Sequence, residues 1–286
     1  MNQPRDIFTL GPAILFCPAD RPQRYIKAAE RADAVILDLE DAVAPDAKDR
    51  ARQALQEHLA TTVAQDATLA ARTIVRINPV GTEMSRADLA TLAGSSVTTV
   101  MVPKVESVHQ LDAVASRLDD HVGMVALVET ARGVAYATAI AEHPRVVAMM
   151  WGAEDLIASM GGSSSRHADG TYRDVPRFAR SQVMVAAASA GVAGVDSIWA
   201  DIQDLQGLRV EVEDAVATGF SAKACIHPSH VATIREGFTP SAADQEYARA
   251  LLAAAEDHPQ GVFSFRGAMV DGPLIAHARR IIARAG

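Results

Sequence analysis

The chain has 286 residues, of which 49% are hydrophobic and 22% charged, and its formal net charge is −8. This composition is typical of a globular protein with a large core, and the acidity argues against nucleic acid and anionic membranes as partners. Two cysteines cannot form a disulfide framework, the N-terminus does not read as a secretion signal, and no apolar run is long enough to cross a bilayer, so we expect a cytoplasmic protein.

Eight short apolar runs alternate with helix-like stretches along the chain. They cover residues 13–18, 34–39, 73–78, 98–103, 123–128, 146–151, 196–201 and 222–227. Near-continuous apolarity is typical of parallel strands that are buried on both faces. Eight such units favour a (β/α)₈ TIM barrel, and an open doubly wound sheet is the alternative, because periodicity alone does not separate the two.

The alternation of strands and helices ends near residue 237. We therefore divide the chain into a TIM-barrel catalytic domain, 1–237, and a short C-terminal helical extension, 238–286. In the extension, Ser241 is the expected N-cap of a first helix, and residues 273–285 predict a final helix. We expect the extension to act as a lid or as an arm that contacts a partner.

Polar residues collect at the C-terminal ends of the predicted strands, and in a barrel these ends form the rim at which active sites lie. Glu129 follows the fifth run and Asp155 follows the sixth. Together they offer hard oxygen ligands with no competing thiolate or imidazole nearby, which suits Mg²⁺. The alternative is that both residues simply begin helices.

Arg76 lies within the third apolar run, where a charge needs a partner. One interpretation is that it binds a carboxylate through two parallel hydrogen bonds or stabilises an oxyanion. The other is a structural salt bridge with Asp38 or Glu40. The acidic run DLED, which includes Glu40 and Asp41, requires Arg, Lys or a metal close by, although both residues are equally consistent with helix entry.

Three basic residues near the first two strands, Arg21, Lys27 and Lys48, are candidates for binding phosphate groups, against the alternative of a solvated helix face. Asp271 precedes Gly-Pro, which is an ordinary start of a helix. Its functional interpretation is a general acid or base that the C-terminal extension brings to the site.

Three further features are assigned without a catalytic role. The segment GGSSSRHADGTY, residues 161–172, is interpreted as a mobile loop on the active rim. His227, at the end of the eighth run, is interpreted as a hydrogen-bonded core histidine. Cys17 and Cys225 are expected to be buried thiols.

The motifs ILFCPADRPQRYIKA, AVILDLEDAVAPDAKDRAR, VRIN, VPKVES, VETARG, GAEDL and KACIHPSHV occur in this order. Together they resemble the citrate lyase beta-subunit and malyl-CoA lyase family, within the wider HpcH/HpaI aldolase group, over nearly the whole chain. The resemblance implies a TIM barrel in which Glu129 and Asp155 bind Mg²⁺ and Arg76 contacts oxygen atoms of the substrate. We also expect a homo-oligomer, a trimer or a hexamer.

Two positions depart from the pattern of relatives. Asp41 stands where the free-acid aldolases of the wider group carry a histidine, which argues against that branch. Ala19 stands where many relatives have glycine, and its methyl group restricts how closely a ligand approaches the backbone. In addition, the MVDGP segment resembles the tail of malyl-CoA and citramalyl-CoA lyases, where an aspartate reaches the site, often that of a neighbouring subunit. This resemblance favours a catalytic Asp271.

The resemblance thus implies a Mg²⁺-dependent carbon–carbon lyase that cleaves or forms a 3-hydroxyacyl-CoA thioester of malyl, citramalyl or citryl type. The implied catalytic set is Arg76, Asp271, Glu40 and Asp41, and the implied contacts to substrate and CoA are Arg76, Arg21, Lys27 and Lys48. Hydrolysis of the thioester is the outcome if Asp271 positions water. The alternatives are a citrate lyase beta-type subunit that acts on a carrier-protein thioester, and a free-acid 2-keto-acid aldolase.

Overall fold

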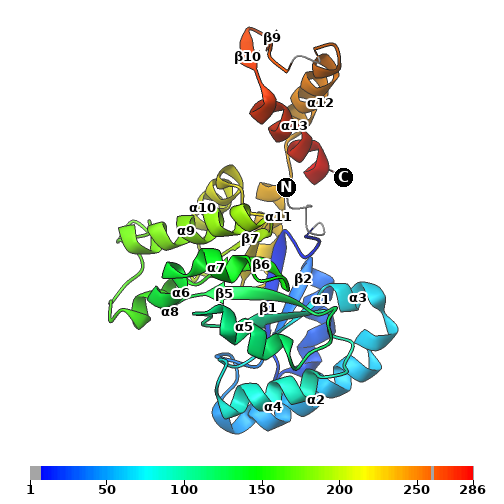
Figure 1. The fold of residues 1–286 in the computed structure, drawn as a ribbon, viewed down its shortest axis with the longest axis vertical. Coiled ribbons are helices and arrows are strands. Elements are labelled where there is room, and N and C mark those ends of the chain that lie inside the picture. Colours follow the sequence, from blue (N-terminus) through cyan, green and yellow to red (C-terminus); the bar gives the residue numbers. More distant parts are fainter. Residues whose placement is uncertain (1–7, 259–260, 286) are drawn as a thin grey trace. The chain divides into compact units, whose positions relative to one another are not determined.

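The computed structural model describes residues 8–258 and 261–285 of the chain, and these form two compact units (Figure 1). The boundary in sequence lies between Ile234 and Arg235, inside helix α11 (His230–Phe238). The expectation that the chain lacks a secretion signal rests on its N-terminal segment. Most of that segment lies outside the described residues.

The first unit is a closed barrel of eight parallel strands in chain order. The strands are β1 (Ala13–Pro18), β2 (Ala34–Asp38), β3 (Thr73–Arg76), β4 (Thr99–Val102), β5 (Gly123–Val128), β6 (Val146–Trp151), β7 (Ala193–Asp196) and β8 (Ala222–Cys225). Because β1 pairs with β8 as well as with β2, the sheet has no free edge. The predicted TIM barrel is confirmed, and the open sheet is excluded.

Helices follow the strands and surround the barrel (Figure 1). They are α1 (Tyr25–Arg31), α2 (Lys48–Thr61), α3 (Ala67–Ala71), α4 (Glu83–Leu92), α5 (Val108–Ala115), α6 (Ala131–Ala135), α7 (Ala137–Ala141), α8 (Ala153–Ser159), α9 (Asp174–Ala190) and α10 (Leu205–Thr218), with 3-10 turns η1 (Pro22–Arg24), η2 (Pro45–Ala47) and η3 (Val63–Gln65). Among the described residues, no helix is both long and apolar enough to span a bilayer.

The barrel interior is filled by branched and sulfur-containing side chains, among them Ile14, Ile36, Ile74, Met101 and Val125. Successive residues of a strand point to opposite faces, so the residues between these inward positions pack against the helices, which explains why the runs read as continuously apolar. Both cysteines are buried, as expected. The polar ends of the strands remain available for the rim.

The seventh strand lies earlier than the sequence predicts. Its residues are Ala193–Asp196, so the predicted run 196–201 begins where the strand ends. Gly194 packs so closely against α9 that a Cβ there would lie 2.6 Å from the Sδ of Met184. The strand has only four residues, of which Val195 alone is branched, and the carboxylate at its end is Asp196 and not Asp201.

The second unit consists of two helices and a short hairpin. These elements are α12 (Ala242–Glu256), β9 (Phe263–Phe265), β10 (Ala268–Val270) and α13 (Gly272–Ala285). Leu251, Phe263, Val270 and Ala278 are buried together, which gives the unit a small core of its own. The hydroxyl of Ser241 accepts a hydrogen bond from the backbone of Asp244 at 3.1 Å, so the predicted N-cap is confirmed.

The antiparallel hairpin of β9 and β10 does not follow from the sequence pattern, because each strand has only three residues. Its turn is made by Arg266 and Gly267, both of which have positive φ. Asp271 comes directly after β10 and accepts a weak hydrogen bond from the backbone of Leu274 at 3.4 Å. The action of this unit as a lid stays a prediction.

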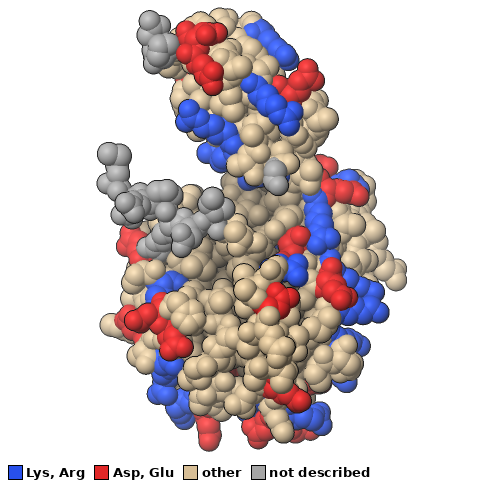
Figure 2. All heavy atoms as spheres, turned by 90° about the vertical axis from the view of Figure 1, so that its right-hand side faces the viewer, with Lys and Arg blue, Asp and Glu red and all other residues tan. Residues whose placement is uncertain are grey.

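Figure 2 shows one face of the molecule, on which acidic and basic side chains are intermixed. This is what 35 acidic and 27 basic residues produce when they are distributed over a surface. A nucleic-acid-binding protein instead concentrates its basic residues on one face, and the side in view has no such concentration.

Candidate active site

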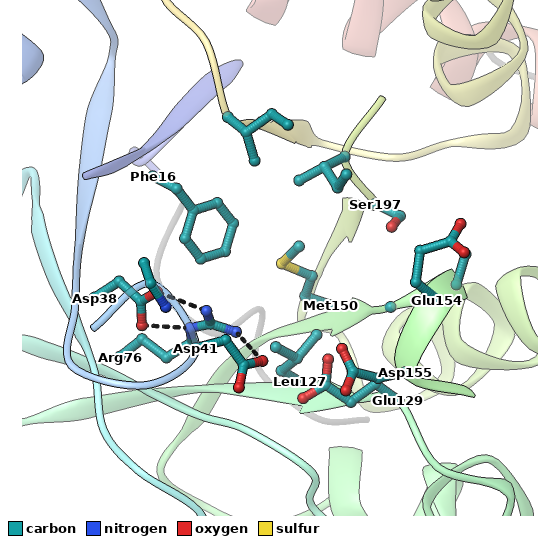
Figure 3. Close-up of a pocket in the computed structure, with 15 residues that line it drawn as sticks. Phe16, Asp38, Asp41, Arg76, Leu127, Glu129, Met150, Glu154, Asp155 and Ser197 are labelled. Atoms are coloured by element: carbon teal, nitrogen blue, oxygen red, sulfur yellow. Dashed lines mark hydrogen bonds and ion pairs between the residues drawn. The ribbon is translucent and has the colours of Figure 1, made fainter. Parts of the chain in front are cut away.

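The C-terminal ends of the strands enclose a cavity of about 370 Å³ (Figure 3). Its lining includes Phe16, Asp38, Asp41, Arg76, Leu127, Glu129, Met150, Glu154, Asp155 and Ser197. Charged side chains that follow four different strands therefore share one cavity. This is the rim at which the sequence analysis expects the chemistry to take place.

Arg76 is held in place by the residues that follow β2. Its Nε and Nη2 donate to the two carboxylate oxygens of Asp38 at 2.7 and 2.6 Å, as the dashed lines in Figure 3 show. The register of the barrel places the two residues opposite each other. Nη1 lies 2.7 Å from Oε2 of Glu40, and the guanidinium lies 5.0 Å from the ring centre of Phe16.

These contacts leave part of the Arg76 guanidinium free. A guanidinium carries five N–H donors. Asp38 accepts hydrogen bonds from two of them, and the carboxylates of Glu40 and Asp41 form ion pairs with Nη1 at 2.7 and 4.0 Å. Burial opposes the charge of Arg76, but its hydrogen bond to Asp38 and the charges of the nearby carboxylates raise its pKa above the ordinary value. Arg76 is therefore a fixed cation that lines the cavity, so the structural and functional interpretations of this residue are compatible.

Glu129 and Asp155 lie next to each other in the cavity (Figure 3). Glu129 follows β5 and is buried, and Asp155 lies in the first turn of α8, with 40% of its side chain exposed. Burial raises the pKa of Glu129 to about 8, and the negative charges of Asp155 and Glu40 contribute to this rise. The carboxylates of Glu129 and Asp155 therefore lie close enough to repel each other, and a cation bound between them would relieve this repulsion.

A magnesium ion fits this pair of side chains. Carboxylate oxygens are hard ligands, and Mg²⁺ is commonly held by one or two of them together with water. Two carboxylate ligands would leave the remaining coordination positions to water and to substrate, which is what a catalytic site requires.

Lys104 lies among the acidic residues of the site, although the sequence analysis gives it no role. Its ammonium donates to Oε1 of Glu40 at 2.6 Å and lies 3.4 Å from Asp155. Burial alone would lower the pKa of Lys104, but the hydrogen bond to Glu40 and the charges of the surrounding carboxylates raise it. The only signal in the sequence is its place at the end of a strand, in the motif VPKVES.

The residues of the DLED motif have different environments. Glu40 is 3% exposed and is held by Arg76 and Lys104, and burial raises its pKa. Asp41 lines the cavity, and 59% of its side chain is exposed. Glu40 therefore orients Arg76, whereas Asp41 can reach a ligand in the cavity.

Lys48 does not face the cavity as a substrate contact would. Its ammonium is buried and donates to the backbone oxygens of Leu39 and Glu40 at 2.5 and 2.6 Å and to Oδ1 of Asn78 at 2.8 Å. These are three acceptors for the three N–H groups of an ammonium. Lys48 therefore supports the DLED segment in this structure, and its contact with substrate stays a prediction.

A second cavity, of about 590 Å³, lies beside the first between β1, α1 and the end of β8. Its lining includes the basic residues Arg24, Lys27 and Arg31, together with His227. Phe16 and Ile226 line both cavities, so the two are adjacent. Lys27 is thus found where an anionic ligand could bind, whereas Arg21 is not among the lining residues.

One expectation about the nearby segments is wrong in part, and the mobility of the loop 161–172 stays a prediction. His227 is exposed, and the buried histidine of the motif KACIHPSHV is His230. The loop 161–172 is held by specific contacts: Arg166 forms an ion pair with Glu211 at 2.8 Å, and the hydroxyl of Ser165 donates to Oε1 of Glu154 at 2.5 Å. The loop therefore supports the first turn of α8, on which Asp155 lies.

Residues 13–228 match the sequence pattern of the HpcH/HpaI aldolase/citrate lyase family. The chain belongs to this family. It is 49% identical over 276 residues to a citrate lyase subunit beta-like protein of Mycobacterium tuberculosis, with 96% of each chain covered. It is 37% identical to a (3S)-malyl-CoA thioesterase of Cereibacter sphaeroides, which covers 96% of this chain and 94% of that protein.

A solved structure resembles the whole chain closely. It is the protein CitE from Mycobacterium tuberculosis in complex with magnesium, acetoacetate and coenzyme A, with a TM-score of 0.87, 48% identity, and coverage of 97% of this chain and 98% of that one. The chain is thus an enzyme of a family of carbon–carbon lyases. The expectation that magnesium is the metal of this family is confirmed by that structure.

Proposed function

We propose that the chain is a Mg²⁺-dependent lyase that cleaves or forms the carbon–carbon bond of a 3-hydroxyacyl-CoA thioester of malyl, citramalyl or citryl type. The observation that carries this proposal is one cavity that is lined by Glu129, Asp155 and Arg76. A pair of hard oxygen ligands beside a fixed guanidinium suits a reaction in which negative charge develops on oxygen. The relatives named above support a thioester of coenzyme A as the substrate.

In this proposal, Glu129 and Asp155 hold the metal. When bound, Mg²⁺ acts as a Lewis acid toward the oxygen atoms of the keto acid that leaves or enters. Arg76 would offer the N–H groups that Asp38 does not bind to the oxygen on which charge develops, and its contacts with Asp38 and Glu40 keep it in place. Such preorganised donors act without reorientation during the reaction.

Asp271 is proposed to transfer the proton. During cleavage, the hydroxyl group loses its proton to water and its carbon becomes a carbonyl, while the electron pair of the broken carbon–carbon bond passes to the thioester enolate. A general acid then protonates the enolate carbon, and in the reverse direction the same carboxylate removes that proton. Asp271 follows β10 at the start of α13, and the second unit would have to deliver it to a barrel of its own chain or of a neighbouring copy.

The second cavity is proposed to bind the CoA moiety. Arg24, Lys27 and Arg31 offer positive charge for its phosphates. Phe16 and Ile226, which line both cavities, would then contact the arm that brings the thioester to the metal site. Arg21 has 54% of its side chain exposed beside Asp20, and it is a weaker candidate for the same phosphates.

We also propose that the enzyme is cytoplasmic and forms a homo-oligomer, a trimer or a hexamer. A neighbouring copy could supply Asp271 only if such an assembly forms. Light scattering coupled to size-exclusion chromatography distinguishes these states from a monomer.

One experiment tests the proposed activity. The protein is incubated with Mg²⁺ and malyl-, citramalyl- or citryl-CoA, and the products are identified by mass spectrometry, with Glu129→Gln as the control. A lyase releases a shorter acyl-CoA and a keto acid, whereas a thioesterase releases free CoA and the intact hydroxy acid. Turnover only of a carrier-protein thioester, or only of a free 4-hydroxy-2-keto acid, would replace the proposal with one of the two alternatives.

A further inference from the structure

Lys104 has a backbone conformation that few residues other than glycine adopt. It follows β4 at the rim with a φ of 50°, in the left-handed region, which is unfavourable for a residue with a Cβ. Such a conformation persists only where the surrounding structure imposes it, and it is found most often at functional sites. The motif VPKVES therefore has a lysine where a glycine would be less strained.

This conformation directs two groups of Lys104 at the proposed metal ligands. The backbone N–H donates to Oε1 of Glu129 at 3.1 Å. The ammonium lies 3.4 Å from Oδ1 of Asp155 and 4.0 Å from Oε1 of Glu129. The same ammonium donates to Glu40 at 2.6 Å and lies 3.5 Å from Asp41. One side chain thus connects the acidic residues that follow β2 with those that follow β5 and β6.

We propose that Lys104 is a positioning residue that keeps Glu40 and Asp41 off the metal and moderates the affinity of Glu129 and Asp155 for Mg²⁺. This inference rests on the proposed metal site. Asp41 lines the same cavity as the two ligands, and a third or fourth carboxylate would occupy positions that a substrate must take from water. By binding these carboxylates itself, Lys104 leaves those positions open.

Removal of the ammonium has two effects that act in the same direction. It takes away a positive charge that lies within about 4 Å of both proposed ligands, and it removes the contact of Lys104 with Asp41 and one of the two contacts that hold Glu40. We therefore expect Lys104→Met to bind Mg²⁺ about tenfold more tightly or better, a modest change for charges at this separation. The same variant should turn over the thioester more slowly, because the oxygen atoms of the substrate then compete with Glu40 and Asp41 for coordination positions on the metal.

Calorimetric titration with MgCl₂ alone measures this affinity in the absence of substrate. Lys104→Met and Lys104→Gly both lose the ammonium, but glycine adopts the left-handed conformation without strain, so the backbone N–H that donates to Glu129 stays in place. Lys104→Arg keeps the charge and is the matched control. We expect tighter binding in the first two variants and nearly unchanged binding in the third, whereas damage to the fold would weaken binding and turnover together.

The results separate this inference from the proposed function. If Glu129→Gln abolishes Mg²⁺ binding, but Lys104→Met and Lys104→Gly bind the ion no more tightly than the wild type, the role of Lys104 is overturned and the metal site stands. If Glu129→Gln binds Mg²⁺ as the wild type does, both the site and the role of Lys104 are overturned.

Discussion

A Cβ atom at Gly152 would lie 2.7 Å from Oε2 of Glu129 and 2.9 Å from its Cβ. Gly152 lies between β6 and α8, and Glu129 follows β5, so the backbone and the carboxylate come into close contact at the floor of the cavity. No side chain fits between them without moving Glu129. The glycine of the motif GAEDL therefore allows Glu129 to lie beside Asp155.

Gly152→Ala should weaken Mg²⁺ binding in a folded protein, because the added methyl group displaces the Glu129 carboxylate. We expect a loss of about 10- to 100-fold in affinity, the range found when residues that orient a metal ligand are changed. Calorimetric titration measures it. Gly272→Ala is the control, since its added Cβ would meet nothing within 4 Å. Wild-type affinity in Gly152→Ala would show that the position of Glu129 does not matter for the metal.

Glu129→Gln and Asp155→Asn should each reduce Mg²⁺ affinity by at least about 100-fold, because each removes a charged ligand and not merely the support of one. Both substitutions preserve side-chain size, and in Glu129→Gln the amide oxygen of the new side chain can still accept the N–H of Lys104 that now reaches Oε1. Mn²⁺ binding followed by electron paramagnetic resonance measures the loss. Glu106→Gln is the control, because Glu106 follows β4 at the same rim but does not line the cavity. This variant should bind Mn²⁺ as the wild type does.

Much of the barrel follows from local sequence. Strands β1 and β6 have the predicted bounds, because long apolar runs in an α/β chain have few other places to be buried. Strand β7 could not be located, since Ala193 and Gly194 owe their strand conformation to packing against α9 and not to their own propensity.

The site shows a similar division between local and tertiary information. Glu129, Asp155 and Arg76 could be selected because each comes at the end of a predicted strand, where a barrel gathers its polar residues. Lys104 and Lys48 could not be distinguished in this way. Lys104 follows a predicted strand and Lys48 begins a predicted helix, but the left-handed backbone of the first and the three acceptors around the second arise only from the folded chain.

Arg76→Lys should retain the fold and lose most of the activity. A lysine keeps the charge but cannot form the paired hydrogen bonds with Asp38 and also offer further N–H groups to the cavity that Arg76 lines. We expect kcat to fall by about 10²- to 10³-fold, as for the loss of a donor to a developing oxyanion. Mg²⁺ affinity, measured in parallel, should change little, and a large change would place Arg76 in the support of the metal and not in the chemistry.

Acid should destabilise the barrel through Asp196 at the end of β7. Burial would raise the pKa of this carboxyl, but Lys223 at 3.0 Å, Arg180 at 2.9 Å and the indole N–H of Trp151 lower it from 3.8 to about 2. A carboxyl whose pKa is lower in the folded state stabilises it above the unfolded pKa, and this contribution is lost as the pH falls toward 2. The loss amounts to about 2 kcal/mol.

Urea denaturation between pH 6 and pH 2, over a range of about four units, measures this loss as a falling free energy of unfolding. In Asp196→Asn the dependence on pH should be shallower by the contribution of one carboxyl, although the variant starts from a lower stability because Lys223 and Arg180 lose their shared partner. An equally steep dependence in the variant would assign the acid sensitivity to other carboxyl groups.

Asp271→Asn should lower kcat by about 10²- to 10⁴-fold, the usual effect of losing a general acid or base, and should leave Mg²⁺ affinity unchanged, because Glu129 and Asp155 belong to the first unit. Asparagine keeps the size of the side chain and the acceptor for the backbone N–H of Leu274. The variant therefore tests proton transfer and not the start of α13. Wild-type turnover would remove Asp271 from the mechanism.

The source of this aspartate can be tested with the same variant. Asp271→Asn is mixed with Arg76→Lys after reversible dissociation of the subunits, and the activity of the reassembled protein is compared with that of each variant alone. If one copy supplies Asp271 to the barrel of another, mixed assemblies contain some sites with both wild-type residues, so activity should rise well above that of either variant. If each chain completes its own site, every site carries one substitution, and mixing restores nothing.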